Sequence, residues 1–219
     1  MATPWQVPKL WAGRTVAVMA SGPSMSATVA EAVRAADLPA VAVNDTHRLA
    51  PWAAVLYAAD SSWWAHHAAT ALHFPGIKAT ANDSVPYRAV HLLRPTGIDG
   101  FDPDPGCLRT GGNGGYQALH LAVHAGAARI LLFGFDLDDS AGRHWHGSHP
   151  EPLTNTAPGV FAIWRARFAT LVEPLRARGV EVVNCAPQSA LHCWPLADPF
   201  ETLAGARTCP TSSTSPPGA

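Results

Sequence analysis

The chain has 219 residues, of which 47% are hydrophobic and 14% are charged, and its formal net charge is -1. A sequence of this length and composition is typical of one globular domain with a sizeable buried core. The balanced charge and the lack of a Lys/Arg cluster argue against a nucleic-acid-binding protein, because such proteins present a basic face to their ligand.

The first half of the sequence alternates short apolar runs with segments of helical spacing. The apolar runs predict buried strands over residues 15–20, 40–44, 54–60 and 77–81. Helical spacing predicts helices over residues 27–36 and 61–72. Ser24 or Ser26 is the expected cap of the first helix. Residues 82–108 are rich in Pro, and we expect them to be irregular, with a weak strand signal near residues 88–92.

The second half gives clearer signals. Apolar patterns predict a helix, a strong strand, an amphipathic helix and a last strand over residues 116–124, 129–136, 160–178 and 180–184. Gly126 ends the first of these helices, and residues 137–158 form a polar loop after the strong strand. Pro174 predicts a kink or a break in the amphipathic helix.

These elements predict a single domain over residues 1–205, followed by a Pro/Ser/Thr-rich tail over residues 206–219 that we expect to be disordered. Strands alternating with helices predict a Rossmann-like, doubly wound α/β fold with a mostly parallel sheet and helices on both faces. Ligands bind such sheets at the carboxyl ends of the strands. Polar residues follow or end the predicted strands at these positions: Ser21, Asn44, Asp60, Asp136 and Asn184.

The turn Ser21-Gly22-Pro23-Ser24 lies between the first predicted strand and the first predicted helix. Gly22 lets the backbone approach a ligand closely, the serines offer hydroxyl donors, and the start of a helix favours phosphate. The turn matches neither a dinucleotide fingerprint nor a P-loop, so an ordinary capped turn is the alternative. Asn44 and Asp45 follow the second strand, where such side chains contact a ribose or base, or cap the next segment.

A second glycine-rich turn precedes the helix predicted over residues 116–124. It contains Gly112, Asn113 and Gly114. The alternatives are a backbone that wraps a ligand and a loop that is simply flexible. Because this turn also leads into the N-terminus of a helix, we favour a ligand contact.

Three histidines stand close together in the predicted polar loop: His144, His146 and His149. Because imidazole titrates near neutral pH, they suggest a general base or acid. The His-x-His spacing also suits two ligands of a metal ion, which we rank second, and a polar loop with incidental histidines is the remaining alternative. Asp136 and Asp138 lie just before the loop and are candidate ligands for Mg²⁺.

Other features suggest ordinary structural roles. His120 and His124 have a spacing that suits a metal, but no third ligand is in view, so we expect them to be structural. The four cysteines match no zinc-binding or CxxC pattern. The sequence has no secretory segment and no apolar run long enough to span a membrane. We therefore expect a cytoplasmic protein with free thiols.

Several segments occur in an order that resembles a known superfamily. They cover residues 18–25, 43–45, 110–116, 132–136, 147–149 and 184–191. This order resembles the bacterial sialyltransferases of the Campylobacter type. It also resembles a related superfamily that holds flagellin-modifying motility-associated glycosyltransferases and an archaeal 6-hydroxymethylpterin pyrophosphokinase, and above all their small bacterial and phage look-alikes.

The resemblance implies a nucleotide site at the strand tips of a Rossmann-like sheet. In the sialyltransferases, the Gly-Pro-Ser turn and the Asn after the second strand contact a cytidine nucleotide sugar, and a loop histidine deprotonates the acceptor. Carried over by position, the base is His149, with His146 as the fallback. The implied donor contacts are Ser21, Gly22, Ser24, Asn44, Gly114 and Asp136.

The sequence departs from this family at two positions. Ser21 stands where the family's turn carries Asn, and Leu137 follows the strand where the family has tyrosines that help the phosphate to leave. Arg143, His144, His146 or a metal ion would have to take over that role.

The resulting hypothesis is a nucleotide-dependent transferase, specifically a glycosyltransferase with a nucleotide-sugar donor, a small-molecule or glycan acceptor and a histidine base. One alternative is a Mg²⁺-dependent pyrophosphokinase that acts on a small hydroxymethyl, pterin-like acceptor. Another is a non-catalytic nucleotide-binding protein of the phage type. The candidate cofactor is Mg²⁺, and the sequence does not determine the oligomeric state.

Overall fold

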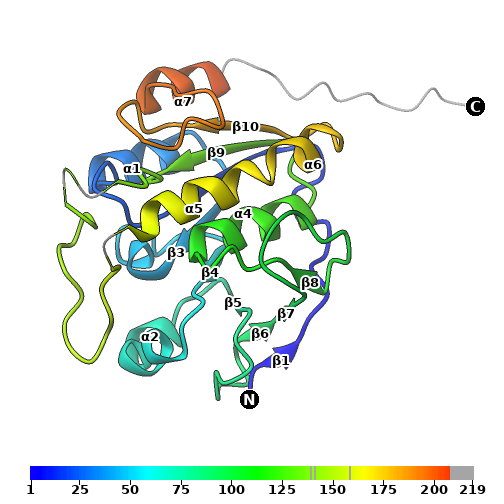
Figure 1. Ribbon diagram of the computed structural model, residues 1–219, viewed down its shortest axis with the longest axis vertical. Helices are drawn as coiled ribbons and strands as arrows, with labels where there is room; N and C mark the ends of the chain where they lie inside the picture. The colour runs from blue at the N-terminus through cyan, green and yellow to red at the C-terminus, as the bar shows by residue number, and fades with distance from the viewer. Residues whose placement is uncertain (139, 141, 158, 208–219) are drawn as a thin grey trace, which may run out of the picture.

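The computed structural model describes residues 1–138, 140, 142–157 and 159–207. Within these residues, eight strands form one sheet in which every neighbouring pair is parallel (Figure 1). From one edge to the other they are β1 Thr3–Pro4, β6 His91–Leu92, β5 Ile77–Thr80, β4 Val55–Tyr57, β3 Ala40–Val43, β2 Thr15–Met19, β9 Arg129–Phe133 and β10 Glu181–Asn184. The predicted Rossmann-like α/β fold is confirmed.

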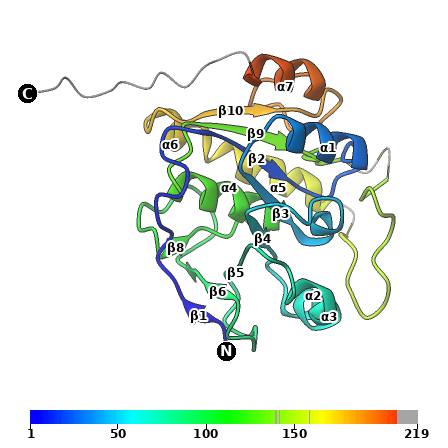
Figure 2. The ribbon, with the colours of Figure 1, turned by 180° about the vertical axis from the view of Figure 1, so that it is seen from behind.

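Helices cover both faces of this sheet. They are α1 Ala27–Ala35, α2 Ser61–His66, α3 Ala68–Ala71, α4 Gly114–His124, α5 Val160–Ala169, α6 Val172–Arg176 and α7 Pro199–Arg207, with a 3-10 helix η1 Asn44–Arg48. α4, α5 and α6 pack on one face, and α1, α2 and α7 on the other, as Figures 1 and 2 show from opposite sides. Two short strands, β7 Arg94–Pro95 and β8 Cys107–Leu108, pair separately.

The central strand β2 shows why the sequence forms buried strands. Its Val16 and Val18 belong to the core beneath α4, whereas Ala17 and Met19 belong to the core beneath α1. Successive side chains of a strand point to opposite faces, and here both faces are covered by helices. A run of apolar residues, with no polar alternation, is therefore the pattern that this position requires.

The order of the strands places a ligand site. β2 pairs with β3 on one side and with β9 on the other. The chain builds β3, β4 and β5 outward from β2, and later returns with β9 and β10 on the opposite side. This is the doubly wound pattern, and ligands bind it in the crevice beside the carboxyl ends of the strands where the order reverses. That point lies between β2 and β9.

Both of the longer predicted helices are interrupted. Residues 61–72 form α2 and α3, with His67 between them. The helix predicted over residues 160–178 forms α5 and α6, and it breaks at Thr170 and Leu171, ahead of Pro174. A proline ring clashes with the carbonyl four residues earlier, which here belongs to Thr170, so the break falls on that side of the proline.

The sequence patterns gave no signal for α7. It packs against α1 and buries Leu203. It also includes two residues, 206 and 207, that the composition assigned to the disordered tail. Residues 208–219 of the predicted tail lie outside the described part of the chain. None of the helices in the described part is long and apolar enough to cross a membrane. The described cysteines, Cys107, Cys185 and Cys193, are free, as expected, and Cys209 lies outside that part.

Candidate functional site

A cavity of about 460 Å³ opens at the carboxyl edge of the sheet, at the point between β2 and β9. The segments that follow β2, β3, β4, β5 and β9 line it, together with the start of α4. It brings together most of the residues singled out in the sequence: Ser21, Gly22, Pro23, Asn44, Asp60, Gly112, Asn113, Gly114, Asp136, Asp138, His144 and His149. Ser24, Asp45 and His146 do not line it.

The donors of the first turn are already used by the protein itself. The Ser21 hydroxyl lies 3.3 Å from the carbonyl oxygen of Val43 and 3.2 Å from Oγ1 of Thr46. Ser24 donates to Asp136 through both its amide, at 3.3 Å, and its hydroxyl, at 2.8 Å. Phosphate binding at this turn therefore stays a prediction, and any such ligand would compete with a carboxylate.

The first helix begins where the sequence predicts it, after the turn. α1 starts at Ala27, and Ser26, one of the two caps considered, accepts a hydrogen bond from the amide of Val29 at 3.2 Å. Ser24 does not cap the helix, because its hydroxyl binds Asp136. The N-terminal amides of α1 are thus separated from the cavity wall by the turn.

Gly22 is required by close packing. Its amide donates to the carbonyl of Gly134 at 2.9 Å. A Cβ at this position would lie 2.5 Å from that carbonyl oxygen and would collide with the Asp136 carboxylate. Burial raises the pKa of Asp136, and the hydrogen bonds from Ser24 oppose the shift. The turn and the end of β9 therefore form one interlocked unit at the floor of the site.

The second glycine-rich turn presents free donors to the cavity. Asn113 caps α4, because its side-chain oxygen accepts from the amide of Tyr116 at 3.0 Å. Among the described residues, the amides of Gly114 and Gly115 have no hydrogen-bond acceptor. Both residues line the cavity. Unpaired amides at the positive end of a helix dipole suit an anion such as phosphate.

Two residues with strained backbones also line the cavity. Asn44 and Leu137 both adopt left-handed backbone conformations, with φ of 51°, although neither is a glycine. The side-chain oxygen of Asn44 is also buried without a hydrogen-bond partner among the described residues. Backbone strain and an unpaired polar atom are costly, and they concentrate at ligand sites, where the ligand supplies the missing contact.

The histidine loop is anchored to the strand ends through Trp145. The Trp145 amide donates to the carbonyl of Ser21 at 3.0 Å, and its indole nitrogen donates to Thr46 at 3.3 Å. The Arg48 guanidinium lies 5.5 Å above the Trp145 ring. These contacts hold the residues on either side of Trp145 in the loop against the sheet, so the neighbouring histidines face the cavity region.

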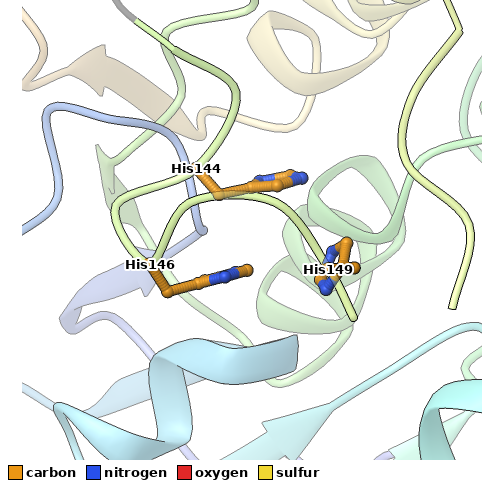
Figure 3. A group of neighbouring side chains, drawn as sticks. All are labelled: His144, His146 and His149. Carbon is orange, nitrogen blue, oxygen red and sulfur yellow. The ribbon is translucent and has the colours of Figure 1, made fainter. Parts of the chain in front are cut away.

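The three histidines of this loop converge (Figure 3). His144 and His146 stack with ring centroids 5.0 Å apart, and His149 lies 4.8 Å from the first and 4.9 Å from the second. Burial, with repulsion from the other two rings, lowers the pKa of His144 to about 4. Burial also lowers the pKa of His146, although Asp45 opposes the shift. Both rings are therefore neutral at pH 7.

Asp45 lies beneath the histidine cluster as a buried carboxylate. It accepts a hydrogen bond from the indole of Trp63 at 2.9 Å, and it lies 3.9 Å from ring nitrogens of His146 and His149 and 3.5 Å from His67. Burial alone would raise the pKa of Asp45, but the Trp63 bond and the surrounding histidines lower it below its usual value. Asp45 is thus a fixed negative charge and makes no direct contact with a ligand in the cavity.

The cavity wall is acidic. Among the described residues, four carboxylates line it, those of Asp60, Asp83, Asp136 and Asp138, against one guanidinium, that of Arg143. Burial raises the pKa of Asp60, and the nearby His149 opposes the shift. An anionic ligand in this cavity therefore requires a cation beside it, because the carboxylates would otherwise repel it.

Some cavity residues were missed by sequence reasoning. Asn82 and Asp83 follow β5, and the rule that located the other polar strand ends would have found them. Phe161 and Trp164 of α5 line the cavity. Their spacing had been interpreted as part of an apolar core stripe, and periodicity alone does not separate a core face from a ligand-facing one.

The histidines expected to be structural are so. His120 accepts a hydrogen bond from the amide of Asp102 at 2.9 Å and stacks on Phe101. His124 lies 2.9 Å from the carbonyl oxygen of Cys107. Both are buried away from the cavity. No family model, curated protein or solved structure matches this chain, so the interpretation of the cavity rests on its own geometry.

Proposed function

We propose that the protein is a nucleotide-dependent transferase, a glycosyltransferase that holds a nucleotide-sugar donor in the cavity between β2 and β9. The observation that carries the proposal is the arrangement around one cavity of two unpaired helix amides, the unpaired side-chain oxygen of Asn44 and the histidine loop. The volume of about 460 Å³ falls within the range of small-molecule and cofactor sites.

The lining suggests how such a donor lies. Its phosphates would accept hydrogen bonds from the amides of Gly114 and Gly115. The nucleoside would pack against Phe161 and Trp164, which line the cavity. The rings of these two residues pack edge to face with centroids 5.5 Å apart. The transferred group would then face the histidine loop.

The chemistry follows from direct displacement at the donor carbon. The acceptor hydroxyl loses its proton as the bond to the donor carbon forms, and the nucleotide phosphate leaves with the bonding electrons. The resemblance in motif order assigns the proton acceptor to the histidine loop, on which His144 and His149 line the cavity. Arg143 and the amides of α4 are positioned to stabilise the leaving phosphate.

Gly114→Glu tests the donor site. A Cβ on Gly114 meets only Val43, at 3.4 Å, and Asn44, at 3.9 Å, so the fold accommodates a side chain there. A carboxylate in the first turn of α4 stabilises the helix by about 0.3–1 kcal/mol but repels phosphate. We expect unchanged or higher thermal stability, together with donor affinity lowered by about tenfold or more. Ala204→Glu, on the exposed side of α7, is the matched control for charge.

The readout is a thermal shift with CMP-sugars, UDP-sugars, and ATP with Mg²⁺. Stabilisation by a nucleotide sugar that Gly114→Glu abolishes and Ala204→Glu preserves supports the proposal. If none of these ligands stabilises the wild-type chain, nucleotide binding in this cavity is refuted.

The acidic wall favours one second candidate, a Mg²⁺-dependent pyrophosphokinase acting on a small hydroxymethyl acceptor. Asp136 and Asp138 offer the oxygen ligands that Mg²⁺ prefers. Stabilisation by ATP only in the presence of Mg²⁺, with no response to nucleotide sugars, would select this function over glycosyl transfer.

A further inference from the structure

The histidine loop carries a second possibility that does not depend on the proposed function. Each of His144, His146 and His149 offers one ring nitrogen, and these three atoms all lie within 4.8 Å of one another. The nitrogen Nε2 of His146 is buried and has no hydrogen-bond partner among the described residues. The His146 side chain is 7% exposed, and a buried nitrogen without a partner is costly.

We propose that His144, His146 and His149 form a binding site for a divalent transition metal of the Zn²⁺ class, open to the cavity. Imidazole nitrogen is a preferred ligand of Zn²⁺, and three histidines with one open position form a recognised type of zinc site. Mg²⁺ prefers oxygen ligands, so this site differs in chemistry from the one that Asp136 and Asp138 could offer.

The distances fit an empty site that closes by a small movement. A tetrahedral Zn²⁺ with nitrogens at about 2.0–2.1 Å holds its ligand atoms about 3.3 Å apart. The ring nitrogens here lie within 4.8 Å of one another, so rotation of the imidazoles and a shift on the order of 1 Å suffice. Figure 3 shows the rings of His144 and His146 extending in the same direction, toward His149.

Asp45 supplies the charge that such a site needs. Its carboxylate lies 3.9 Å from Nε2 of His146 and from Nδ1 of His149, and Trp63 fixes it in place. A buried carboxylate this close to metal-binding histidines offsets the positive charge of the ion. The Asp45 carboxylate is buried, and it also lies 3.6 Å from the Arg48 guanidinium.

The open position would face the ligand cavity. His144 and His149 line the cavity, whereas His146 does not. A metal held by all three would therefore present its remaining coordination position to a ligand in the cavity. It would also bring positive charge to a wall that carries four carboxylates and one guanidinium among the described residues. As metal ligands, His144 and His149 would no longer be available as bases, so a metal-loaded site would need another proton acceptor for the transfer.

Metal uptake by the full chain, expressed without a polyhistidine tag, tests the inference. After dialysis against a chelator, we expect the wild type to bind one Zn²⁺ per chain in a competition titration with a chromophoric chelator. Co²⁺ in its place should give the visible absorption of a nitrogen-rich, four- or five-coordinate site. His146→Ala should weaken Zn²⁺ binding by about 100-fold or more, because loss of a ligand exceeds the effect of an outer partner.

The controls separate a built site from incidental histidines. His192→Ala removes an exposed imidazole elsewhere and should leave uptake unchanged. Asp45→Asn keeps the acceptor for Trp63 but removes the charge, and it should weaken binding by about 10–100-fold. His149→Asn is a second ligand variant, and circular dichroism shows which variants fold.

If the wild type binds less than one Zn²⁺ per chain, the site is overturned. If folded His146→Ala or His149→Asn binds Zn²⁺ as tightly as the wild type, the site is overturned as well. A Co²⁺ spectrum typical of six oxygen ligands overturns it even if every variant unfolds. Thermal shifts with nucleotides in the presence of chelator measure the donor site separately, so either proposal can fail alone.

Discussion

Acid should destabilise this protein through His120, a fully buried histidine of α4. Its Nε2 accepts a hydrogen bond from the amide of Asp102, so a proton on that nitrogen would remove the acceptor. Burial, with repulsion from His124, lowers the pKa of His120 from 6.5 to about 3. Asp102 favours protonation and Arg109 opposes it, but neither offsets burial.

The size and sign of the effect follow from linkage. Between pH 6.5 and about 3, the unfolded chain binds a proton at this site and the folded chain does not. The free energy of unfolding therefore falls as the pH falls through this window. From pH 7.5 to pH 5, the loss contributed by His120 alone is about 2 kcal/mol.

Urea unfolding of the wild type and of His120→Gln, at pH 7.5 and pH 5, measures this loss. Gln keeps an acceptor for the Asp102 amide but does not titrate, so the variant should lose about 2 kcal/mol less than the wild type between the two pH values. His192→Gln, at an exposed histidine, controls for the removal of an imidazole. Equal losses in His120→Gln and the wild type would refute the reasoning.

Three further changes test local packing and helix capping. Gly22→Ala should lower the free energy of unfolding by about 1–3 kcal/mol, because its Cβ collides with Asp136 and crowds the carbonyl of Gly134. Gly205→Ala in α7 should instead raise the free energy of unfolding by up to about 1 kcal/mol, because its Cβ meets nothing within 4 Å. Urea denaturation measures both variants, and a change of the same sign in their free energies of unfolding would contradict the argument. Asn113→Ala should cost about 1 kcal/mol in the same assay by removing the cap of α4, and an unchanged midpoint would show that the cap does not stabilise the protein.

The fold was predictable because its signals are local. Each buried strand is a short apolar run, and the polar residue after it marks the carboxyl edge where the cavity opens. A kink or a break was predicted at Pro174, and the break between α5 and α6 lies a few residues before it, at Thr170 and Leu171. α7 was missed because its sequence has little periodicity, and tertiary packing against α1 determines its helical state.

The roles within the site were less predictable because they depend on contacts between distant residues. The sequence indicated donors at Ser24, but Asp136, far along the chain, takes them. It indicated Asn113 as a ligand contact, whereas its side chain caps α4 and the two following amides are left free. Likewise, Asp45 was expected at the ligand and instead lies beneath the histidine cluster. Which partner satisfies a given polar group is a tertiary property that residue spacing does not encode.

The use of the first turn by Asp136 is the reason that we place the proposed phosphate site at α4 instead of at that turn. A carboxylate bound to the amide and hydroxyl of Ser24 occupies the place that an anion would take at that turn. α4 also begins at the cavity, and its amides at Gly114 and Gly115 have no acceptor among the described residues. Because carboxylates outnumber Arg143 in the wall, a phosphorylated donor needs a cation alongside it. The histidine loop, of which His144 and His149 line the same cavity, is where we propose that the chain holds one.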